Sequence, residues 1–296
     1  MKDWISAFRL RTLPLALASI GMGSFLAASN GHFKWSVFLL CALTTILLQI
    51  LSNLANDYGD TVHGADSDNR LGPQRAVQSG AISLTAMKKA LYICSFLAFT
   101  SGITLLLVAF DNLGSIFWVF IGLGLLAIAA AITYTAGYRP YGYAGLGDIS
   151  VLIFFGAVAV LGSYYLYAQS LSIDLILPAM SMGLLSVGVL NVNNIRDIPS
   201  DLLAGKKSIP VRIGRANAVR YHYLLLISAI VCSIVYVLLN YSNPTQFIFL
   251  VTLPLLWTNA KAVSLRVQAE ALDPYLKQLA MSTLAFVLLF GIGQLI

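Results

Sequence analysis

The sequence predicts an all-α polytopic membrane protein whose nine helices cross the bilayer, and three observations predict this class. The 296 residues are 58% hydrophobic and only 10% charged, whereas a soluble domain carries about 25% charged residues. The mean hydropathy is correspondingly high at +0.82. Nine apolar runs are each long enough, or nearly long enough, to cross a bilayer. This composition excludes a cytosolic globular protein, a disordered chain and a basic protein that binds nucleic acid.

The nine apolar runs are continuous rather than alternating, which favours membrane-spanning helices over the strands of a barrel. The first run is longer than the apolar segment of a usual signal peptide and no clear cleavage site follows it, so we expect it to remain in the protein. The eighth run is short. The expected spans are Leu13–Ser29, Trp35–Leu54, Ala90–Phe110, Gly114–Tyr134, Ile149–Ala168, Leu175–Val192, Tyr221–Asn240, Phe247–Thr258 and Leu276–Leu295.

Basic residues are distributed very unequally between the two sides of this arrangement. All but one of the 18 Lys and Arg residues fall on the side of the N-terminus, and the exception is Lys34. The positive-inside rule therefore predicts a cytoplasmic N-terminus and, after nine spans, a periplasmic C-terminus. The same bias accounts for much of the net charge of +6 without nucleic acid. We expect a multi-pass protein of the bacterial inner membrane, surrounded by lipid and without a protein partner.

Two long loops on the predicted cytoplasmic side, 55–89 and 193–220, hold most of the polar residues. The connections on the other side are short. Long ordered loops in compact proteins are usually functional, so we expect the functional site at the cytoplasmic face.

The first long loop begins with a polar stripe. Its members stand at i, i+3, i+4 and i+7, so they share one face if the second helix continues through them. They are Asn53, Asn56, Asp57 and Asp60. Further along the same segment lie Asp66, Arg70 and Arg75.

The second long loop carries a similar stripe at i, i+4 and i+8, formed by Asn193, Asp197 and Asp201. Pro199 predicts a kink or a helix end within it. The two segments superimpose at an offset of 140 residues, which pairs Asn53 with Asn193 and Asp57 with Asp197. We therefore predict one membrane domain over residues 1–296, with an internal four-helix repeat. Motif one covers 53–75 and motif two covers 193–208.

Two facing stripes of carboxylate and amide oxygens suit Mg²⁺, which usually binds through a few carboxylates together with phosphate oxygens. Basic residues beside both stripes suit an anionic substrate, because Arg can bind phosphate with two hydrogen bonds. They are Arg70, Arg75, Lys206 and Lys207. Together these features predict a Mg²⁺–diphosphate site. The alternative is a pair of solvated loops, and two matched stripes on one side argue against it.

The paired motifs resemble those of the UbiA-type intramembrane prenyltransferases. The resemblance rests on Asn56-Asp57-x-x-Asp60 followed by Asp197-x-x-x-Asp201. It covers nearly the whole chain, including the helix count, the motif positions and the intervening loop 134–148. It implies nine transmembrane helices around a central cavity that is capped on the cytoplasmic side.

The chain departs from the common first motif of that family at one position. A third Asp usually lies four residues beyond the second, but Gly64 stands there and the next acid is Asp66. Four segments are similar to the 1,4-dihydroxy-2-naphthoate polyprenyltransferase branch of the family. They are Phe8–Pro14, Asn56–Asp66, Asn69–Arg75 and Arg139–Asp148.

The resemblance implies transfer of a polyprenyl group from polyprenyl diphosphate to 1,4-dihydroxy-2-naphthoate, with loss of CO₂ and diphosphate. The product would be demethylmenaquinol, a precursor of menaquinone. The resemblance assigns Mg²⁺ to Asp57, Asp60, Asp197 and Asp201, with support from Asn53, Asn56 and Asn193. We expect Arg70, Arg139 and Lys207 to hold the diphosphate, and Arg11 or Arg75 to bind the acceptor carboxylate. The sequence does not identify the general base; Asp66 is a candidate because it lies where the motif departs from the wider family.

Three alternatives remain open at the level of the sequence. The first is a prenyltransferase that uses another aromatic acceptor, such as 4-hydroxybenzoate. The second is a secondary transporter, which can also contain an internal repeat, although ionisable residues are almost absent from the interior of these apolar runs. The third is a phosphotransferase of the CDP-alcohol type, whose Asp residues would lie in one continuous motif rather than two.

Overall fold

The computed structural model describes residues 2–64 and 75–296, and within these ranges the chain is built from helices joined by loops. Nine helical segments of the described residues are long and apolar enough to cross a membrane. This confirms the predicted class and the predicted number of spans. In chain order the elements are α1 (Lys2–Phe8), η1 (Leu10–Thr12), α2 (Leu13–Ser29), α3 (Trp35–Val62), α4 (Leu84–Ala109), α5 (Ser115–Thr133), α6 (Gly147–Val151), η2 (Leu152–Leu161), α7 (Gly162–Ala168), η3 (Ile173–Leu175), α8 (Ile176–Arg196), α9 (Ile198–Leu203), α10 (Ile209–Leu239), η4 (Pro244–Thr252), α11 (Leu253–Leu265) and α12 (Asp273–Leu295).

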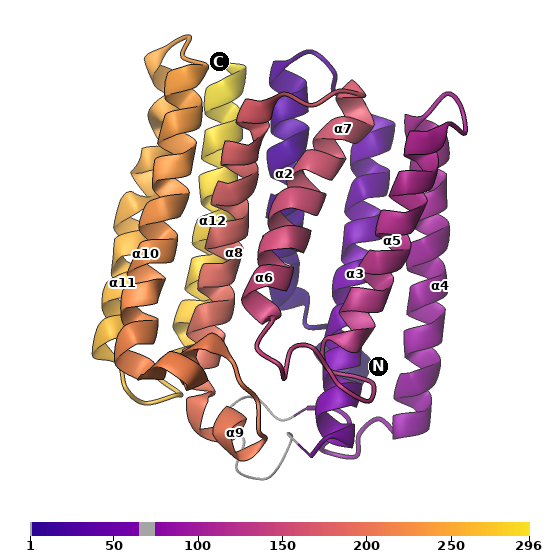
Figure 1. The fold of residues 1–296 in the computed structure, drawn as a ribbon, viewed down its shortest axis with the longest axis vertical. Coiled ribbons are helices and arrows are strands. Elements are labelled where there is room, and N and C mark those ends of the chain that lie inside the picture. The colour runs from indigo at the N-terminus through magenta and orange to yellow at the C-terminus, as the bar shows by residue number, and fades with distance from the viewer. Residues whose placement is uncertain (1, 65–74) are drawn as a thin grey trace.

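The long helices run side by side as one bundle (Figure 1). The C-terminus lies at one end of the bundle, and the short helix α9 lies at the opposite end, together with the loop between α5 and α6 (Figure 1). The N-terminus lies toward the α9 end (Figure 1), as an odd number of crossings requires. That the α9 end faces the cytoplasm remains a prediction from the distribution of Lys and Arg.

Two helices extend well beyond the apolar runs that predicted them. Helix α3 continues to Val62 rather than ending near Leu54, because the polar residues of its last two turns are buried against protein groups. Helix α10 begins at Ile209 rather than near Tyr221 and contains a break at Gly214, whose φ is 76°. Hydropathy alone does not locate the end of a helix that continues beyond the apolar run as a polar helix.

The fifth span is interrupted by a π-helix, η2, between α6 and α7. Its Gly156 lies against α8, where an added Cβ would lie 2.7 Å from the Ala179 carbonyl oxygen. Small residues at such positions allow close packing of membrane helices. π-helical segments are uncommon and frequently occur at functional sites, and η2 contributes directly to the cavity described below.

The buried apolar side chains form two clusters. The larger cluster joins α2, α8, α10, η4 and α12, and its most buried aromatic residues are Phe249, Phe286 and Phe290. The smaller cluster joins α1, α3 and α4 around Leu51, Leu54 and Met87. The cavity described below is lined by members of the larger cluster, such as Ile20 and Cys41, and by Ile128 and Ala131, which pack against the smaller cluster.

Candidate active site

A cavity of about 710 Å³ lies among the helices, bounded by α2–α8 and by the start of α12. Most of its wall is apolar and includes Leu48, Phe99, Phe120, Phe154 and Phe155. The polar part of its lining brings both predicted motifs together and contains Asn53, Asn56, Asp60, Arg75, Asn193, Asp197, Asp201 and Lys206. The expected central cavity is therefore present.

The polar stripe of motif one is helical throughout, because α3 runs on to Val62. Within it, Asn53 donates from its side-chain nitrogen to the carbonyl oxygen of Phe8 at 2.9 Å and to the hydroxyl of Thr12 at 3.0 Å. Asn56 accepts a hydrogen bond from the hydroxyl of Thr135 at 3.0 Å. Asn53 thus holds the N-terminal segment and Asn56 holds the loop after α5.

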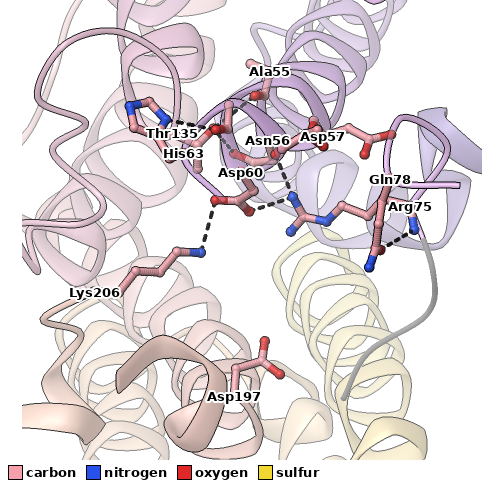
Figure 2. A network of polar contacts seen from close by, with 12 residues as sticks. Ala55, Asn56, Asp57, Asp60, His63, Arg75, Gln78, Thr135, Asp197 and Lys206 are labelled. Atoms are coloured by element: carbon pink, nitrogen blue, oxygen red, sulfur yellow. Dashed lines mark hydrogen bonds and ion pairs between the residues drawn. The ribbon is translucent and has the colours of Figure 1, made fainter. Parts of the chain in front are cut away.

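Asp60, a carboxylate of motif one, is paired with two cations and a tyrosine hydroxyl. Its side chain is 3% exposed, and one oxygen lies 2.5 Å from the Arg75 guanidinium. The other oxygen lies 3.0 Å from the Lys206 ammonium and accepts a hydrogen bond from the Tyr143 hydroxyl at 2.7 Å. Figure 2 shows Arg75 and Lys206 reaching Asp60 from two sides, with Asp197 on the facing segment.

The position of Tyr143 depends on a close approach between its loop and α3. A Cβ on Gly59 would overlap the carbonyl oxygen of Thr135, so only glycine allows this contact. The Arg139–Asp148 segment had been singled out by the family resemblance, but no role had been assigned to Tyr143. This segment contains Tyr141 and Tyr143, and the sequence does not indicate which of the two side chains points toward the carboxylates.

Asp57 is buried and lies beside Asn56 (Figure 2), but it lines a second, smaller cavity of about 350 Å³. Arg9, Arg11 and Asn193 also line this cavity and the larger one, so the two adjoin at the polar end. Asp57 and Asp60 therefore line neighbouring cavities rather than the same one.

Motif two lies where α8 ends and α9 begins. Asp197 is the junction between the two helices, and Pro199 is near the start of α9, as its sequence position predicted. The buried Arg196 side chain donates hydrogen bonds to both carboxylate oxygens of Asp197, at 2.7 and 2.8 Å. Its remaining nitrogen donates to Asp273 at 2.6 Å. The sequence does not indicate a separate role for Arg196, because its burial depends on the packing of segments far apart in the chain.

Asn193 belongs to the same group of side chains. Its amide oxygen accepts from Arg196 at 2.8 Å and its amide nitrogen donates to Asp197 at 3.2 Å. Asn193 therefore helps to fix the orientation of the Asp197 carboxylate.

Asp201 is buried at the start of α9 and accepts a hydrogen bond from the Ser208 hydroxyl at 3.3 Å. Burial raises the pKa of Asp201 to about 6; the nearby charges of Asp197 and Asp60 act in the same direction, and Lys206 opposes them. A carboxyl group with such a pKa is ionised at neutral pH but is close to its titration range.

Lys206 lies between the two motifs. Its ammonium is 3.0 Å from Asp60 and 3.9 Å from Asp201, and it lies over the Tyr143 ring at 4.7 Å from the ring centre. Its neighbour Lys207 points outward: the Lys207 side chain is exposed and does not line the cavity. Of these two lysines, Lys206 lines the cavity, whereas Lys207, which the sequence predicted for the diphosphate, does not.

The other predicted substrate-binding residues are placed differently from one another. Arg139 is exposed and stacks over the Tyr138 ring at 5.4 Å, outside the cavity lining. Arg11 lines both cavities, is half exposed and pairs with Asp273 at 3.8 Å. Asp66 and Arg70 lie outside the described residues.

The donor set at the polar end fits Mg²⁺. Mg²⁺ prefers oxygen ligands and usually binds through one or two carboxylates completed by water and substrate phosphates. In the described part of the chain, no three acidic, His or Cys side chains converge as a closed metal cage. However, Asp60 and Asp201 lie on either side of the Lys206 ammonium. A metal ion bound between the two motifs would need two carboxylates placed in this way.

Comparison with known proteins decides the family. The sequence model of the UbiA prenyltransferase family matches residues 16–290. The chain belongs to the UbiA prenyltransferase family. This confirms the resemblance that the two motifs indicated.

Curated relatives within this family are similar over almost their full length. The 1,4-dihydroxy-2-naphthoate octaprenyltransferase of Haemophilus influenzae is 47% identical over 100% of this chain and 96% of its own length. The enzyme of the same name from Escherichia coli is 48% identical over 98% of this chain and 94% of its own.

Solved structures share the fold of this family member. A UbiA homologue from Aeropyrum pernix has a TM-score of 0.68 at 19% identity and covers 97% of both chains. A UbiA homologue from Archaeoglobus fulgidus, bound to DMAPP and Mg²⁺, has a TM-score of 0.62 at 16% identity, covering 97% of this chain and 98% of the other. At these identities the likeness concerns the fold.

Proposed function

We propose that this protein transfers a polyprenyl group from polyprenyl diphosphate to 1,4-dihydroxy-2-naphthoate, with loss of CO₂ and diphosphate, to give demethylmenaquinol. The observation that carries the transfer chemistry is the meeting of two acidic motifs, with Lys206 between them, at the polar end of an apolar cavity. The full-length relatives at 47% and 48% identity support the naphthoate acceptor and an octaprenyl donor.

The polar end would hold the diphosphate and its metal. Asp57, Asp60, Asp197 and Asp201 would hold Mg²⁺, and the Archaeoglobus homologue bound to Mg²⁺ and DMAPP supports a divalent cation. When bound, Mg²⁺ supplies positive charge that stabilises the negative charge developing on the leaving diphosphate. Arg75 and Lys206 lie beside Asp60 and would bind diphosphate oxygens through charge-assisted hydrogen bonds.

The apolar wall would hold the polyprenyl chain. Phe120 on α5, and Phe154 and Phe155 on η2, line this part of the cavity. When the allylic C–O bond breaks, the diphosphate leaves with the electron pair and the allylic carbon becomes positive. A water-poor cavity protects this carbon from hydrolysis, and aromatic ring faces attract positive charge.

The acceptor would enter beside the N-terminal segment. Arg11 lines both cavities and is half exposed, so it can bind the carboxylate of an aromatic acid without losing a buried partner. Arg75 is 9% exposed and already pairs with Asp60, which fits the diphosphate better than the acceptor. The electron-rich ring then bonds to the allylic carbon and releases CO₂.

We further propose a single membrane domain with two related motifs, located in the bacterial inner membrane and surrounded by lipid. Neither the transfer nor the site residues require a protein partner.

The decisive experiment is an acceptor panel. Purified protein in lipid nanodiscs receives Mg²⁺ and octaprenyl diphosphate with either 1,4-dihydroxy-2-naphthoate or 4-hydroxybenzoate, and products are measured by mass spectrometry. We expect a decarboxylated prenyl-naphthalenediol only with the first acid. Product from 4-hydroxybenzoate alone would move the acceptor assignment to that compound, and no product with either acid would contradict the proposal.

A further inference from the structure

We infer that Lys206 is a displaceable counter-ion that takes the position of the metal between the two acidic motifs, so that the metal and the diphosphate bind together rather than independently. This inference rests on the proposed function, since it assumes that a divalent cation and a diphosphate bind at this end of the cavity. It adds a role for one residue of this chain: coupling the two binding events.

The first step of the argument is the position of the ammonium group. Lys206 lies 3.0 Å from Asp60, which belongs to α3, and 3.9 Å from Asp201, which belongs to α9. Among the residues that the structure describes, it is the side chain that forms ion pairs with both of these acids. A cation that joins the motifs would have to lie close to the same carboxylate oxygens, so the ammonium and the metal compete for them.

The second step concerns charge. Asp60 carries one negative charge and is already paired with both Arg75 and Lys206. A divalent cation that enters this neutralised group gains little attraction from the carboxylates and is repelled by the two basic side chains. Such repulsion is strong in a buried site, because the effective dielectric constant there is well below that of water.

The third step concerns where Lys206 can go. Its side chain is 20% exposed and rests on the Tyr143 ring at the edge of the cavity, so it can move without unpacking the core. A bound diphosphate offers the ammonium new anionic oxygens close by. Departure of Lys206 from Asp60 then frees carboxylate oxygens for the metal, and each ligand favours the other by the same factor.

The next residue provides a matched control. Lys207 has the same side chain and the adjacent position, but its side chain is exposed outside the cavity. A general effect of positive charge near the site would therefore be similar for both lysines, whereas competition for Asp60 and Asp201 is specific to Lys206.

The test measures Mn²⁺ binding by electron paramagnetic resonance on the full-length protein in nanodiscs. The variants are Lys206→Gln, Lys206→Arg and Lys207→Gln, each with and without geranyl thiodiphosphate, a donor analogue that ionises poorly. We expect Lys206→Gln to bind Mn²⁺ alone at least about tenfold more tightly than the unmodified protein. Lys206→Arg and Lys207→Gln should bind Mn²⁺ like the unmodified protein.

The analogue separates the possible outcomes. It should raise the Mn²⁺ affinity of the unmodified protein strongly and that of Lys206→Gln much less. If Lys206→Gln binds Mn²⁺ no more tightly than the unmodified protein, or more weakly with a lower melting temperature, Lys206 has a purely structural role and the inference is overturned while the proposed function stands. If no variant binds Mn²⁺ even with the analogue, both are overturned.

Discussion

Arg196 holds both carboxylate oxygens of its neighbour Asp197, with Nε 2.7 Å from one oxygen and Nη2 2.8 Å from the other. The same guanidinium also donates to Asp273 at the start of α12. One buried cation thus ties the end of α8 to α12 and fixes the orientation of a motif residue. The two motifs are therefore unequal, since Asp197 is held by its neighbour in the chain, whereas Asp60 pairs with Arg75 at the far end of motif one and with Lys206 of motif two.

The first prediction concerns Arg196→Ala. Removal of one partner from a buried ion pair costs about 3–5 kcal/mol, because the remaining charge is left buried, and Asp197 and Asp273 both lose a partner. We expect a large fall in the melting temperature in detergent. The control is Arg220→Ala, an exposed residue that pairs with Asn217 on its own helix, which should change stability by no more than about 0.5 kcal/mol. Equal melting temperatures would contradict the structural role of Arg196.

The second prediction concerns Tyr143→Phe. This change removes only the hydroxyl that donates to Asp60 at 2.7 Å, and hydrogen bonds to charged groups contribute about 1.5–3 kcal/mol. Turnover should fall about tenfold or more, since each 1.36 kcal/mol of transition-state stabilisation is a factor of ten in rate.

The control for that variant is Tyr138→Phe in the same loop, because the Tyr138 side chain is 91% exposed. It should leave turnover unchanged. Equal activity of the two variants would show that the Tyr143 hydroxyl does not act on Asp60.

The third prediction is a dependence of metal binding on pH. The pKa of Asp201 is raised to about 6 by burial, so its carboxylate takes up a proton as the pH falls through 6 and becomes a poorer metal ligand. Mn²⁺ affinity, measured with the donor analogue present, should therefore fall between pH 7.5 and pH 5.

Folding stability should respond in the opposite direction. The pKa of Asp201 is higher in the folded protein than in the unfolded chain, so the folded protein takes up this proton first as the pH falls. The free energy of unfolding of the metal-free protein should therefore rise as the pH falls from 7 toward 4. Asp201→Asn should flatten both dependences over this range. An unchanged pH profile of Mn²⁺ binding in that variant would remove Asp201 from the metal site.

The fourth prediction concerns Gly59→Ala. The added methyl group would overlap the carbonyl oxygen of Thr135 and push the loop that carries Tyr143 away from α3. We expect lower stability and lower turnover. Gly122→Ala on α5 is the control, because an added methyl group there meets nothing within 4 Å, and alanine is favoured over glycine in a helix by up to about 1 kcal/mol. Similar losses in both variants would contradict the argument from close packing.

The fold and the site were predictable to different extents. Continuous apolar runs predict membrane helices well, and the spacing of Asn53 to Asp60 predicted a shared helix face. The family resemblance added the central cavity. The choice between Lys206 and Lys207 was not predictable, because adjacent lysines in a loop have the same chemistry and only tertiary packing decides which one points inward.

Arg196 and Tyr143 show a second limit of the sequence. An Arg at a polar helix end is usually solvated, and nothing local indicated that Asp273 of α12 would lie opposite. Likewise, the contact of Tyr143 with Asp60 joins the loop after α5 to the end of α3, and its position depends on a glycine on the partner helix. Such contacts are set by the packing of segments far apart in the chain.

The most direct test of the central claim uses acceptor labelled with ¹³C in its carboxyl group. Diphosphate and labelled CO₂ are measured together during turnover with octaprenyl diphosphate and Mg²⁺. The account predicts that both are released in equal amounts by the unmodified protein and that Asp60→Asn and Asp201→Asn release neither. Release of diphosphate without labelled CO₂, or normal turnover in either variant, would contradict it.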